Sequence, residues 1–391
     1  MNRLALIAPL FLLPLFAPAA HADGCLPSSC GTSSSAVPGS RYLTLRTDGQ
    51  TGPLVLYDVV AARRHVSLPK GFASADGRVF VSARTLGPSA TRVTRYALPS
   101  GRAVATRNLP GRQWLAAISP TGRRLLLQTV AAKGFTRFAV VDGLRVTRLI
   151  SLRGNYQVET LSPDGQRVFL VHWGDSGRYD LRRFDLRTNK LTATPTRSSE
   201  SGEVEKMQGI ATVGIPSRDG DWLLTLYVKG EGSAFVHALD LRAGVGHCID
   251  LEVPTGDFNT VGTSVLTLSP DQRTLYLAMP LAGRIFAIDL RKLEVIRTAR
   301  FTALAASNYG FGINPSAAVT PNGRMLYVAA GTRLWALDTA AWQLRGPRAI
   351  GTGQTQYATA TGVSPDGRRV VVLRLDRKLV VRDAATLGRI D

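Results

Sequence analysis

The sequence is short of the residues that disulfide frameworks, metal sites and most catalytic centres need. Its 391 residues include only three cysteines and five histidines. A Gly-x-Ser-x-Gly nucleophile motif, a His-Glu-x-x-His or Cys-x-x-Cys pair and a Gly-rich phosphate loop are all missing. Cys25 and Cys30 are close enough in sequence to form a small disulfide ring in an oxidising compartment. Cys248 lies in an apolar stretch and is expected as a buried thiol. We therefore predict no catalytic residues, no metal and no cofactor.

Long apolar runs are also scarce, and the one exception lies at the N-terminus. Arg3 precedes an apolar stretch, residues 4–20, which is followed by Ala20-His21-Ala22 and then Asp23. This is the layout of a cleavable secretory signal. We expect residues 1–22 to be removed and the mature chain to be secreted or extracytoplasmic, at the cell surface or in a periplasm, with no transmembrane segment. Lipid anchoring at Cys25 is the alternative.

Lysine is rare in a chain that is otherwise strongly basic. The net charge is +20, and only seven of the 48 basic residues are lysine, which leaves 41 arginines. The arginines are spread over the whole chain without a basic stripe or tail, so diffuse surface charge is favoured over a dedicated site for anionic polymers. A binder of anionic polymers is kept as an alternative. With 45% hydrophobic and 19% charged residues, the composition excludes a disordered chain.

One turn motif recurs seven times along the chain. The copies are Ser74-Ala75-Asp76-Gly77, Ser119-Pro120-Thr121-Gly122, Ser162-Pro163-Asp164-Gly165, Ser217-Arg218-Asp219-Gly220, Ser269-Pro270-Asp271-Gln272, Thr320-Pro321-Asn322-Gly323 and Ser364-Pro365-Asp366-Gly367. Their third positions are 45, 43, 55, 52, 51 and 44 residues apart, which is the range of repeats that each form one small sheet. Proline, Asp or Asn, and glycine suit successive positions of a tight turn. Each copy therefore predicts one propeller blade.

A run rich in β-branched, aromatic and leucine residues follows each turn, and we interpret these runs as the inner strands. A second run follows and often ends at an aspartate, such as Asp142, Asp185 or Asp240, whose side chain suits a hairpin turn. Helical periodicity is absent. We predict an all-β protein with a β-propeller of seven four-stranded blades over residues 41–391, after a Gly/Ser-rich arm at 23–40. Residues 42–46 and 54–58 look like an additional strand pair, which either completes the last sheet or belongs to an eighth blade.

The repeats resemble a known family. A YVTN-type β-propeller repeat is resembled by the stretch Ser269-Pro270-Asp271, Leu275-Tyr276-Leu277-Ala278 and Ile288-Asp289-Leu290, and also by residues 320–338. TolB-like and WD-type (WD40-like) propellers share the repeated turn. The resemblance covers about residues 41–391. It departs at Gln272, where glycine is missing, and at 96–98, where the acidic turn is lost. Such propellers include lactonases, quinoproteins, transport accessories and passive scaffolds, so the resemblance implies a fold and no single function.

Three connections between repeats are long, namely residues 196–209, 254–263 and 302–316. In a four-stranded blade they lie on the same ring face as the loop between the second and third strands, so we expect them to form one binding surface. The candidate ligand-binding residues there are Trp173, Asp175, Arg178, Lys229, Glu231, Asp257, Phe258, Asn308, Tyr309, Phe311 and Asn314. Aromatic and charged side chains together suit a protein, a peptide, a carbohydrate or a small polar ligand. Ordinary solvated loops are the alternative, and Glu203 and Glu205 look solvated.

The histidines give weak signals. His237 and His247 flank a hairpin. If they were cross-strand neighbours on one face, they could be two ligands of a metal site, although no third ligand is evident. We favour the interpretation that both are exposed side chains on the outer strands. His172 is a lone histidine beside Trp173, and packing is favoured over a role as a base.

These features favour a secreted β-propeller that acts as a non-catalytic binding scaffold for a partner on the long-loop face. The alternatives are a lactonase-like propeller hydrolase that acts on a small polar substrate at the channel mouth, and a binder of anionic polymers.

Overall fold

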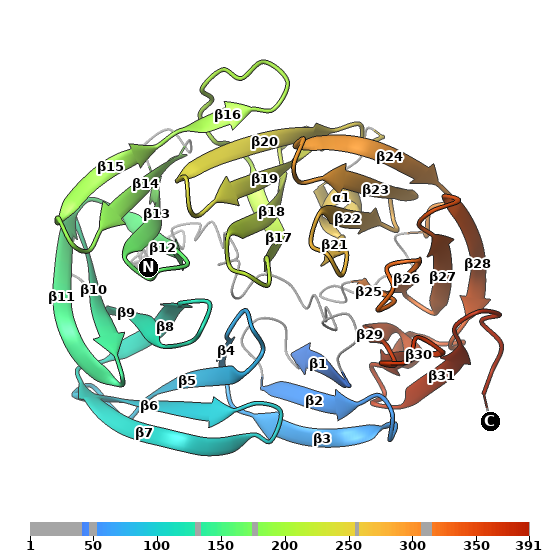
Figure 1. Ribbon diagram of the computed structural model, residues 1–391, viewed down its shortest axis with the longest axis horizontal. Coiled ribbons are helices and arrows are strands. Elements are labelled where there is room, and N and C mark those ends of the chain that lie inside the picture. The colour runs from blue at the N-terminus through green and yellow to red at the C-terminus, as the bar shows by residue number, and fades with distance from the viewer. Residues whose placement is uncertain are drawn as a thin grey trace, which may run out of the picture.

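Consecutive antiparallel strands pair into eight sheets, which stand around a central axis as the blades of a β-propeller (Figure 1). The computed structural model describes residues 41–46, 53–129, 134–173, 179–254, 258–305 and 315–390. We number the blades in chain order and the strand positions within a blade from the centre outward. The predicted all-β propeller is confirmed, and of the two predicted blade counts the larger is the observed one.

The strands follow one another in simple order. Blades 1 to 4 contain β1 (Tyr42–Arg46), β2 (Leu54–Asp58) and β3 (Arg63–Leu68); β4 (Gly71–Ala73), β5 (Val79–Thr85), β6 (Ala90–Ala97) and β7 (Arg102–Pro110); β8 (Gln113–Ile118), β9 (Arg124–Thr129), β10 (Phe135–Asp142) and β11 (Arg145–Arg153); and β12 (Tyr156–Leu161), β13 (Arg167–Trp173), β14 (Tyr179–Asp185) and β15 (Lys190–Thr194).

Blades 5 to 8 continue the pattern, with one additional strand. They contain β16 (Thr196–Ser198), β17 (Ile210–Pro216), β18 (Trp222–Val228), β19 (Ala234–Asp240) and β20 (Val245–Leu251); β21 (Val265–Leu268), β22 (Thr274–Met279), β23 (Arg284–Asp289) and β24 (Glu294–Arg300); β25 (Ser316–Val319), β26 (Met325–Ala330), β27 (Arg333–Asp338) and β28 (Gln343–Ala349); and β29 (Ala358–Val363), β30 (Arg369–Arg374) and β31 (Leu379–Asp383). A short helix, α1 (Phe258–Gly262), precedes blade 6, and a 3-10 turn, η3 (Gln354–Gln356), precedes blade 8. Among the described residues, neither helix type is long and apolar enough to cross a membrane.

Blade 1 settles the blade count. Its strands β1 and β2 pair with β3 in a sheet of their own and not with blade 8. Asp58 at the end of β2 accepts hydrogen bonds from the N–H groups of Val60 and Ala61, both at 3.0 Å. Asp185 makes the same bonds after the third strand of blade 4. We infer that β2 holds the third position, so the described part of blade 1 lacks an innermost strand.

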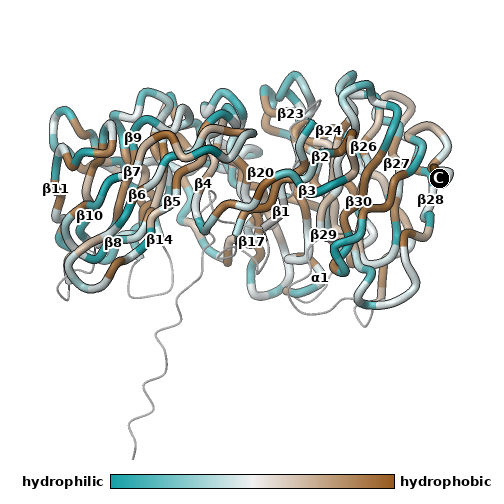
Figure 2. The backbone as a smooth tube through the Cα atoms, turned by 90° about the horizontal axis from the view of Figure 1, so that it is seen from below, coloured by the Kyte–Doolittle hydropathy of each residue, from teal (hydrophilic) through white to brown (hydrophobic). Residues whose placement is uncertain are grey.

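The ring closes through side-chain packing between blades 1 and 8. One cluster joins Leu43, Val55, Tyr57 and Val59 of blade 1 to Ala360, Val371 and Leu373 of blade 8. Equivalent apolar layers fill the other junctions, for example between blades 5 and 6. Figure 2 shows the hydrophobic residues concentrated in the strands and the hydrophilic ones in the loops along both rims.

The repeated turn lies between the first and second strands of a blade. In blade 4 the Ser162 hydroxyl donates to Asp164 Oδ1 at 2.5 Å and accepts from the N–H of Arg167 at 2.9 Å. The runs after the turns are therefore the second strands, which the sheet order places inside each blade. Gln272 stands where the other turns have glycine and adopts the same left-handed conformation, with φ of 60°.

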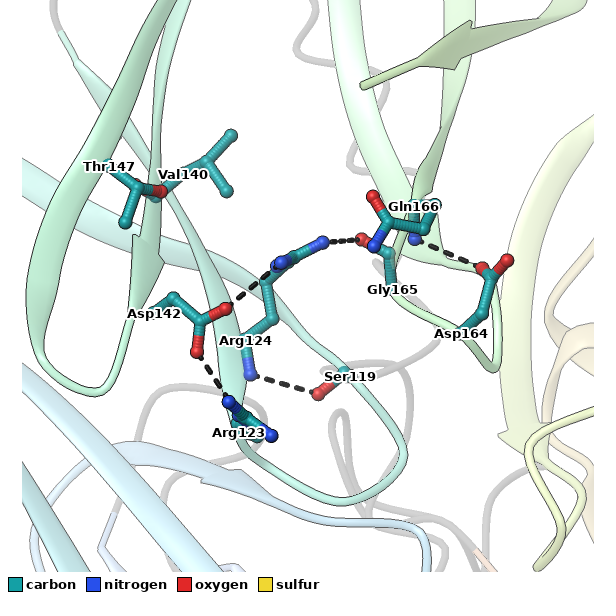
Figure 3. A network of polar contacts seen from close by, with 9 residues as sticks. All are labelled: Ser119, Arg123, Arg124, Val140, Asp142, Thr147, Asp164, Gly165 and Gln166. Carbon is teal, nitrogen blue, oxygen red and sulfur yellow. Dashed lines mark hydrogen bonds and ion pairs between the residues drawn. The ribbon is translucent and has the colours of Figure 1, made fainter. Parts of the chain in front are cut away.

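Arginines connect neighbouring blades on the face that carries these turns. Arg124 of β9 forms an ion pair with Asp142 at 2.9 Å and donates to the carbonyl of Gly165 in blade 4 at 2.7 Å (Figure 3). Arg297 of blade 6 donates to the carbonyl of Ala340 in blade 7 at 2.8 Å. Part of the arginine excess is therefore used for hydrogen bonds between blades.

Arg345 of blade 7 makes the corresponding bond to the carbonyl of Ala385 in blade 8 at 2.9 Å. The guanidinium groups suit this task because each presents several donors and stays charged. Burial raises the pKa of Asp142, but the hydrogen bonds and charges of Arg124 and Arg123 outweigh it and hold the pKa below its ordinary value.

We expect Arg124→Met to lower the free energy of unfolding by about 1–2 kcal/mol, because it removes a charged hydrogen bond between blades and an ion pair. The neighbouring Arg123→Met is the control, since Arg123 is 80% exposed and reaches the same carboxylate at 3.3 Å; it should change stability by less than about 0.5 kcal/mol. Urea unfolding at pH 7 measures both.

The Arg124 effect should shrink in acid. A carboxyl group with a lowered pKa stabilises the folded state above its unfolded pKa, near 4, and loses that contribution as pH falls through the folded value. Equal losses for the two variants at pH 7 would contradict the inter-blade role of Arg124.

Candidate binding face

The loops divide between two faces of the ring. On one face, loops between second and third strands contact the connections between blades: Trp173 N–H, at the end of a second strand, donates to the carbonyl of Asn155 at 3.1 Å, and Leu304 N–H donates to the carbonyl of Pro280 at 3.0 Å. We call this the long-loop face, because the long connections are on it. The repeated turns and the acidic hairpins lie on the opposite face, which we call the turn face.

The first long connection forms a small projecting hairpin that contains β16 (Figure 1). Ser198 N–H donates to the carbonyl of Glu203 at 2.9 Å, and Glu205 N–H donates to the carbonyl of Thr196 at 2.8 Å. The side chain of Val204, which lies in this hairpin, is 63% exposed. Glu203 and Glu205 are exposed, as expected. Strand β16 pairs in parallel with the outermost strand of blade 5, which fixes the base of the hairpin.

The second long connection contains α1. Val261 of this helix is buried, and Phe258 packs on the apolar layer between blades 5 and 6. The Phe258 ring thus supports the loop and presents only part of its surface.

Three further candidates lie near each other at blades 4 and 5. Trp173 is half-buried against Tyr179, with ring centroids 4.8 Å apart, and its Nε1–H donates to Gln157 Oε1 at 3.3 Å. Lys229 Nζ lies 5.4 Å from the centroid of the Phe235 ring.

Glu231 follows Lys229 in the same loop. Its Oε1 accepts a hydrogen bond from the Ser233 hydroxyl at 2.6 Å, and this bond holds the pKa of Glu231 below its ordinary value. Glu231 is therefore a fixed anion beside a cation. The candidates Asp175, Arg178, Asp257, Asn308, Tyr309, Phe311 and Asn314, like Cys25 and Cys30, lie outside the described residues.

The histidine pair does not share a face. The register places Cys248 opposite His237 and Ala238 opposite His247, so the two imidazoles lie on opposite sides of the blade 5 sheet. His237 is buried, contrary to the expectation of exposure, and burial lowers its pKa to about 3. Within the described part of the chain, no three His, Cys, Asp or Glu side chains gather closely enough to hold a metal ion.

The other two predictions of packed side chains agree with the structure. Cys248 is a buried free thiol 4.0 Å from the sulfur of Met207, and burial raises its pKa to about 12. The His172 ring stacks on Tyr156 with centroids 4.7 Å apart, and its Nδ1 lies 3.5 Å from Asp180.

One titratable group was not found from the sequence. Glu159 is the additional residue of a β-bulge in β12, between Val158 and Thr160, and it is buried. Burial raises its pKa to about 8. The bulge positions of blades 5 and 8 hold Thr212 and Thr359, which donate to strand carbonyls. A glutamate in a stretch of ordinary strand residues gives no sequence signal for such a bulge.

Comparisons with known proteins identify the fold. No family model matches the chain, and no curated protein matches its sequence. The dihydro-heme d1 dehydrogenase NirN, solved in complex with DHE, is 16% identical over 91% of this chain and 73% of that chain, with a TM-score of 0.54. The C-terminal WD40 domain of Sif2 is 12% identical over 90% of this chain and 95% of that chain, also with a TM-score of 0.54.

These identities show the fold alone. The chain is thus an eight-bladed β-propeller with WD40-like neighbours, and the YVTN-type or TolB-like subfamily stays a prediction.

We expect Glu159→Gln to stabilise the protein at alkaline pH. A carboxyl group with a raised folded pKa stabilises the folded state fully below its unfolded pKa, near 4.5, and loses this contribution as pH rises to the folded value near 8. The neutral amide has no such loss. Thermal unfolding at pH 5 and pH 8.5 should show a larger fall in melting temperature for the wild type than for the variant. Exposed Glu203→Gln is the control, and parallel pH profiles for all three proteins would refute the assignment.

Proposed function

We propose that the protein is an extracytoplasmic, non-catalytic binding platform, and that the long-loop face captures a protein or peptide partner. The observation that carries the proposal is the exposure of two aliphatic side chains in the first long connection, which leads to this face. Val204, in the hairpin beside the outermost strand of blade 5, is 63% exposed, and Ile210, at the long-loop end of the innermost strand, is 47% exposed. Exposed apolar groups beside charged ones are typical of interaction surfaces.

The turn face supports the proposal by contrast. Its aspartates and several of its arginines are bound to their own turns or to neighbouring blades, for example Asp185 and Arg297. Side chains that hold the fold together are poorly available for a partner. The Lys229 and Glu231 pair, in contrast, lies in an exposed loop of the long-loop face.

The fold neighbours are compatible with more than one kind of partner. The WD40 domain of Sif2 favours a protein-binding role by analogy, and the NirN complex favours a small-molecule role. The exposed Val204 and Ile210 favour the protein or peptide partner, because an extended hairpin offers no enclosed site for a small molecule.

Localisation has a direct test. Mass spectrometry of the exported protein should show a mature chain that begins at Asp23, with two hydrogens lost if Cys25 and Cys30 are joined. A lipid mass on Cys25 would support the anchored alternative, and an intact Met1 would contradict export by a cleaved signal.

The binding face is tested by photo-crosslinking in the cells that export the protein. With p-benzoylphenylalanine at position 204 or 210, we expect discrete adducts with a partner, because both side chains are exposed in the connection that leads to the long-loop face. Position 60 is the matched control: Val60 is also 47% exposed but lies in a hairpin of the turn face. The partner found should bind the purified wild type, and Val204→Asp with Ile210→Asp should weaken it at least tenfold, whereas Val60→Asp should not.

Other outcomes separate the alternatives. Equal yields of adducts at all three positions would contradict the proposed face. So would a partner whose affinity is unchanged by Val204→Asp and Ile210→Asp. Loss of all capture at raised salt, independent of these aliphatic residues, would favour the anionic-polymer alternative.

A further inference from the structure

The outermost strands of blades 3 and 5 can be compared position by position, because the repeated turn gives both blades a common origin. The eighth residue after the serine of the turn is Leu127 in blade 3 and Thr225 in blade 5. From these residues the register leads across the third strand to Leu149 in blade 3 and to Cys248 in blade 5. Leu149 and Cys248 are therefore equivalent.

The two equivalent residues differ in how they are covered. Cys248 is 5% exposed, because β16 pairs with its strand and the Met207 sulfur lies 4.0 Å from its own sulfur. Met207 belongs to the long connection that precedes blade 5. The connection that precedes blade 3 has only Gly111 and Arg112 between β7 and β8, and Leu149 is 73% exposed. Among the described residues, blade 3 thus has no apolar side chain that covers Leu149 as Met207 covers Cys248.

The neighbouring row, nearer the long-loop face, differs in the same direction. In blade 5 it contains Tyr227 and Phe235, whose rings stack with centroids 5.3 Å apart. In blade 3 the equivalent residues are Thr129 and Arg137, which are opposite each other in register. A hydroxyl group and a guanidinium group therefore replace two packed rings, which leaves space on the side of blade 3 that faces blade 2.

A cavity of about 520 Å³ lies in this space. Pro110 and Gly111 line it from the side of blade 2, and Thr129, Arg137 and Leu149 line it from blade 3. No acidic side chain is among the described residues that line it. Because Leu149 is exposed, the cavity is open at the outermost strand. Its volume is in the range of small-molecule sites.

Gln113 limits the cavity on the side of the innermost strand. It is 4% exposed, and its Nε2 donates to the carbonyl of Pro110 at 2.6 Å. Its backbone N–H donates to Thr91 Oγ1 at 2.9 Å, as the N–H of Tyr156 donates to Thr136 Oγ1 at 2.8 Å one junction further on. Gln113 and Tyr156 are thus equivalent and buried, so a ligand has to lie along the third and fourth strands of blade 3.

A cation and an apolar wall lie side by side on these two strands. Arg137 Nε–H donates to Ser151 Oγ, its register partner, at 3.4 Å, and Arg137 forms no ion pair within the described part of the chain. Leu149 and Val146 line the cavity further along the strand of Ser151, toward the turn face. Diagonal neighbours such as Arg137 and Leu149 are about 7–8 Å apart, so one extended ligand can contact both.

We propose that this cavity binds an aliphatic carboxylate of medium chain length. The carboxylate pairs with the guanidinium group of Arg137, which suits bidentate pairing, and accepts a hydrogen bond from the Ser151 hydroxyl. The alkyl chain lies along Leu149 and Val146. It covers Leu149 in the way that the unbranched side chain of Met207 covers the equivalent residue of blade 5.

The ligand used for the test is octanoate, measured by calorimetric titration of the purified protein. Two relatives test one part of the ligand each: 1-octanol has the same chain without the charge, and butyrate has the charge on a shorter chain. We expect one octanoate to bind per chain. Octanol and butyrate should each bind at least about fivefold more weakly, which is the scale of one lost charged contact or of a few buried methylene groups.

Substitution of the cation tests the carboxylate contact. Arg137→Gln should weaken octanoate at least about fivefold and leave the affinity for octanol unchanged. Arg92→Gln is the matched control, because Arg92 follows Thr91 as Arg137 follows Thr136 but contacts Asn108 within blade 2, at 3.1 Å. It should bind octanoate as the wild type does.

Two further substitutions test the site of the alkyl chain. Thr129→Tyr introduces the ring that blade 5 has at Tyr227, and it should abolish binding of both octanoate and octanol. Leu149→Ser removes the apolar wall and should weaken both at least about fivefold. Its control is Ile296→Ser, since Ile296 is 43% exposed on the outermost strand of blade 6 and should not affect binding.

Several results would overturn the proposal. These are no binding of octanoate at millimolar concentration, equal affinities for octanoate and octanol, or unchanged binding by a folded Thr129→Tyr variant. If Thr129→Tyr fails to fold, Leu149→Ser still decides whether the chain lies on this wall, because that side chain is exposed. Since Val204 and Ile210 are in the connection before blade 5, failure here leaves the proposed function of the long-loop face untouched.

Discussion

A propeller blade has two apolar faces, and each must be covered by a neighbouring blade. In β26 the alternate residues show this directly, because Tyr327 packs toward blade 8 while Leu326 and Val328 pack toward blade 6. No blade can meet this need alone, so stability requires a complete ring. The ring closes by packing Leu43 and Val55 against blade 8, and this interface replaces the strand exchange that often joins chain ends. The side chains within the strands therefore serve stability. Specific binding has to come from the loops and from gaps between blades.

The same constraint divides the polar residues between the two faces. The turn face must hold every blade at its angle to the next, and it does so with short local turns and with arginines such as Arg124, which reaches the carbonyl of Gly165. A strongly basic composition is therefore partly a structural property of this ring. The long-loop face has no comparable set of Ser–Asp turns among its described residues, which is why its longer connections are free to differ between blades.

Local features were predictable from the sequence and long-range ones were not. The seven turns could be found because Ser, Asp and Gly interact within a few residues, as Ser162 and Asp164 do. Blade 1 was ambiguous because it has no such turn before Tyr42, although the Asp58 hairpin was a usable signal. The register of the β19–β20 hairpin places His237 and His247 on opposite sides of the sheet, and the bulge at Glu159 recurs in the first strands of blades 5 and 8. Neither register has a local signal in the sequence. The equivalence of Gln113 and Tyr156 became visible only through the threonine hydrogen bonds.

This equivalence also bears on why the junctions differ. A buried acceptor without a partner costs about 1–3 kcal/mol, and Gln113 Oε1 is such an acceptor. The fold does not require that cost, because Tyr156 occupies the same backbone position with its ring packed against His172. In a repeat protein the backbone is nearly the same at each junction, so a costly side chain at one of them needs a local reason.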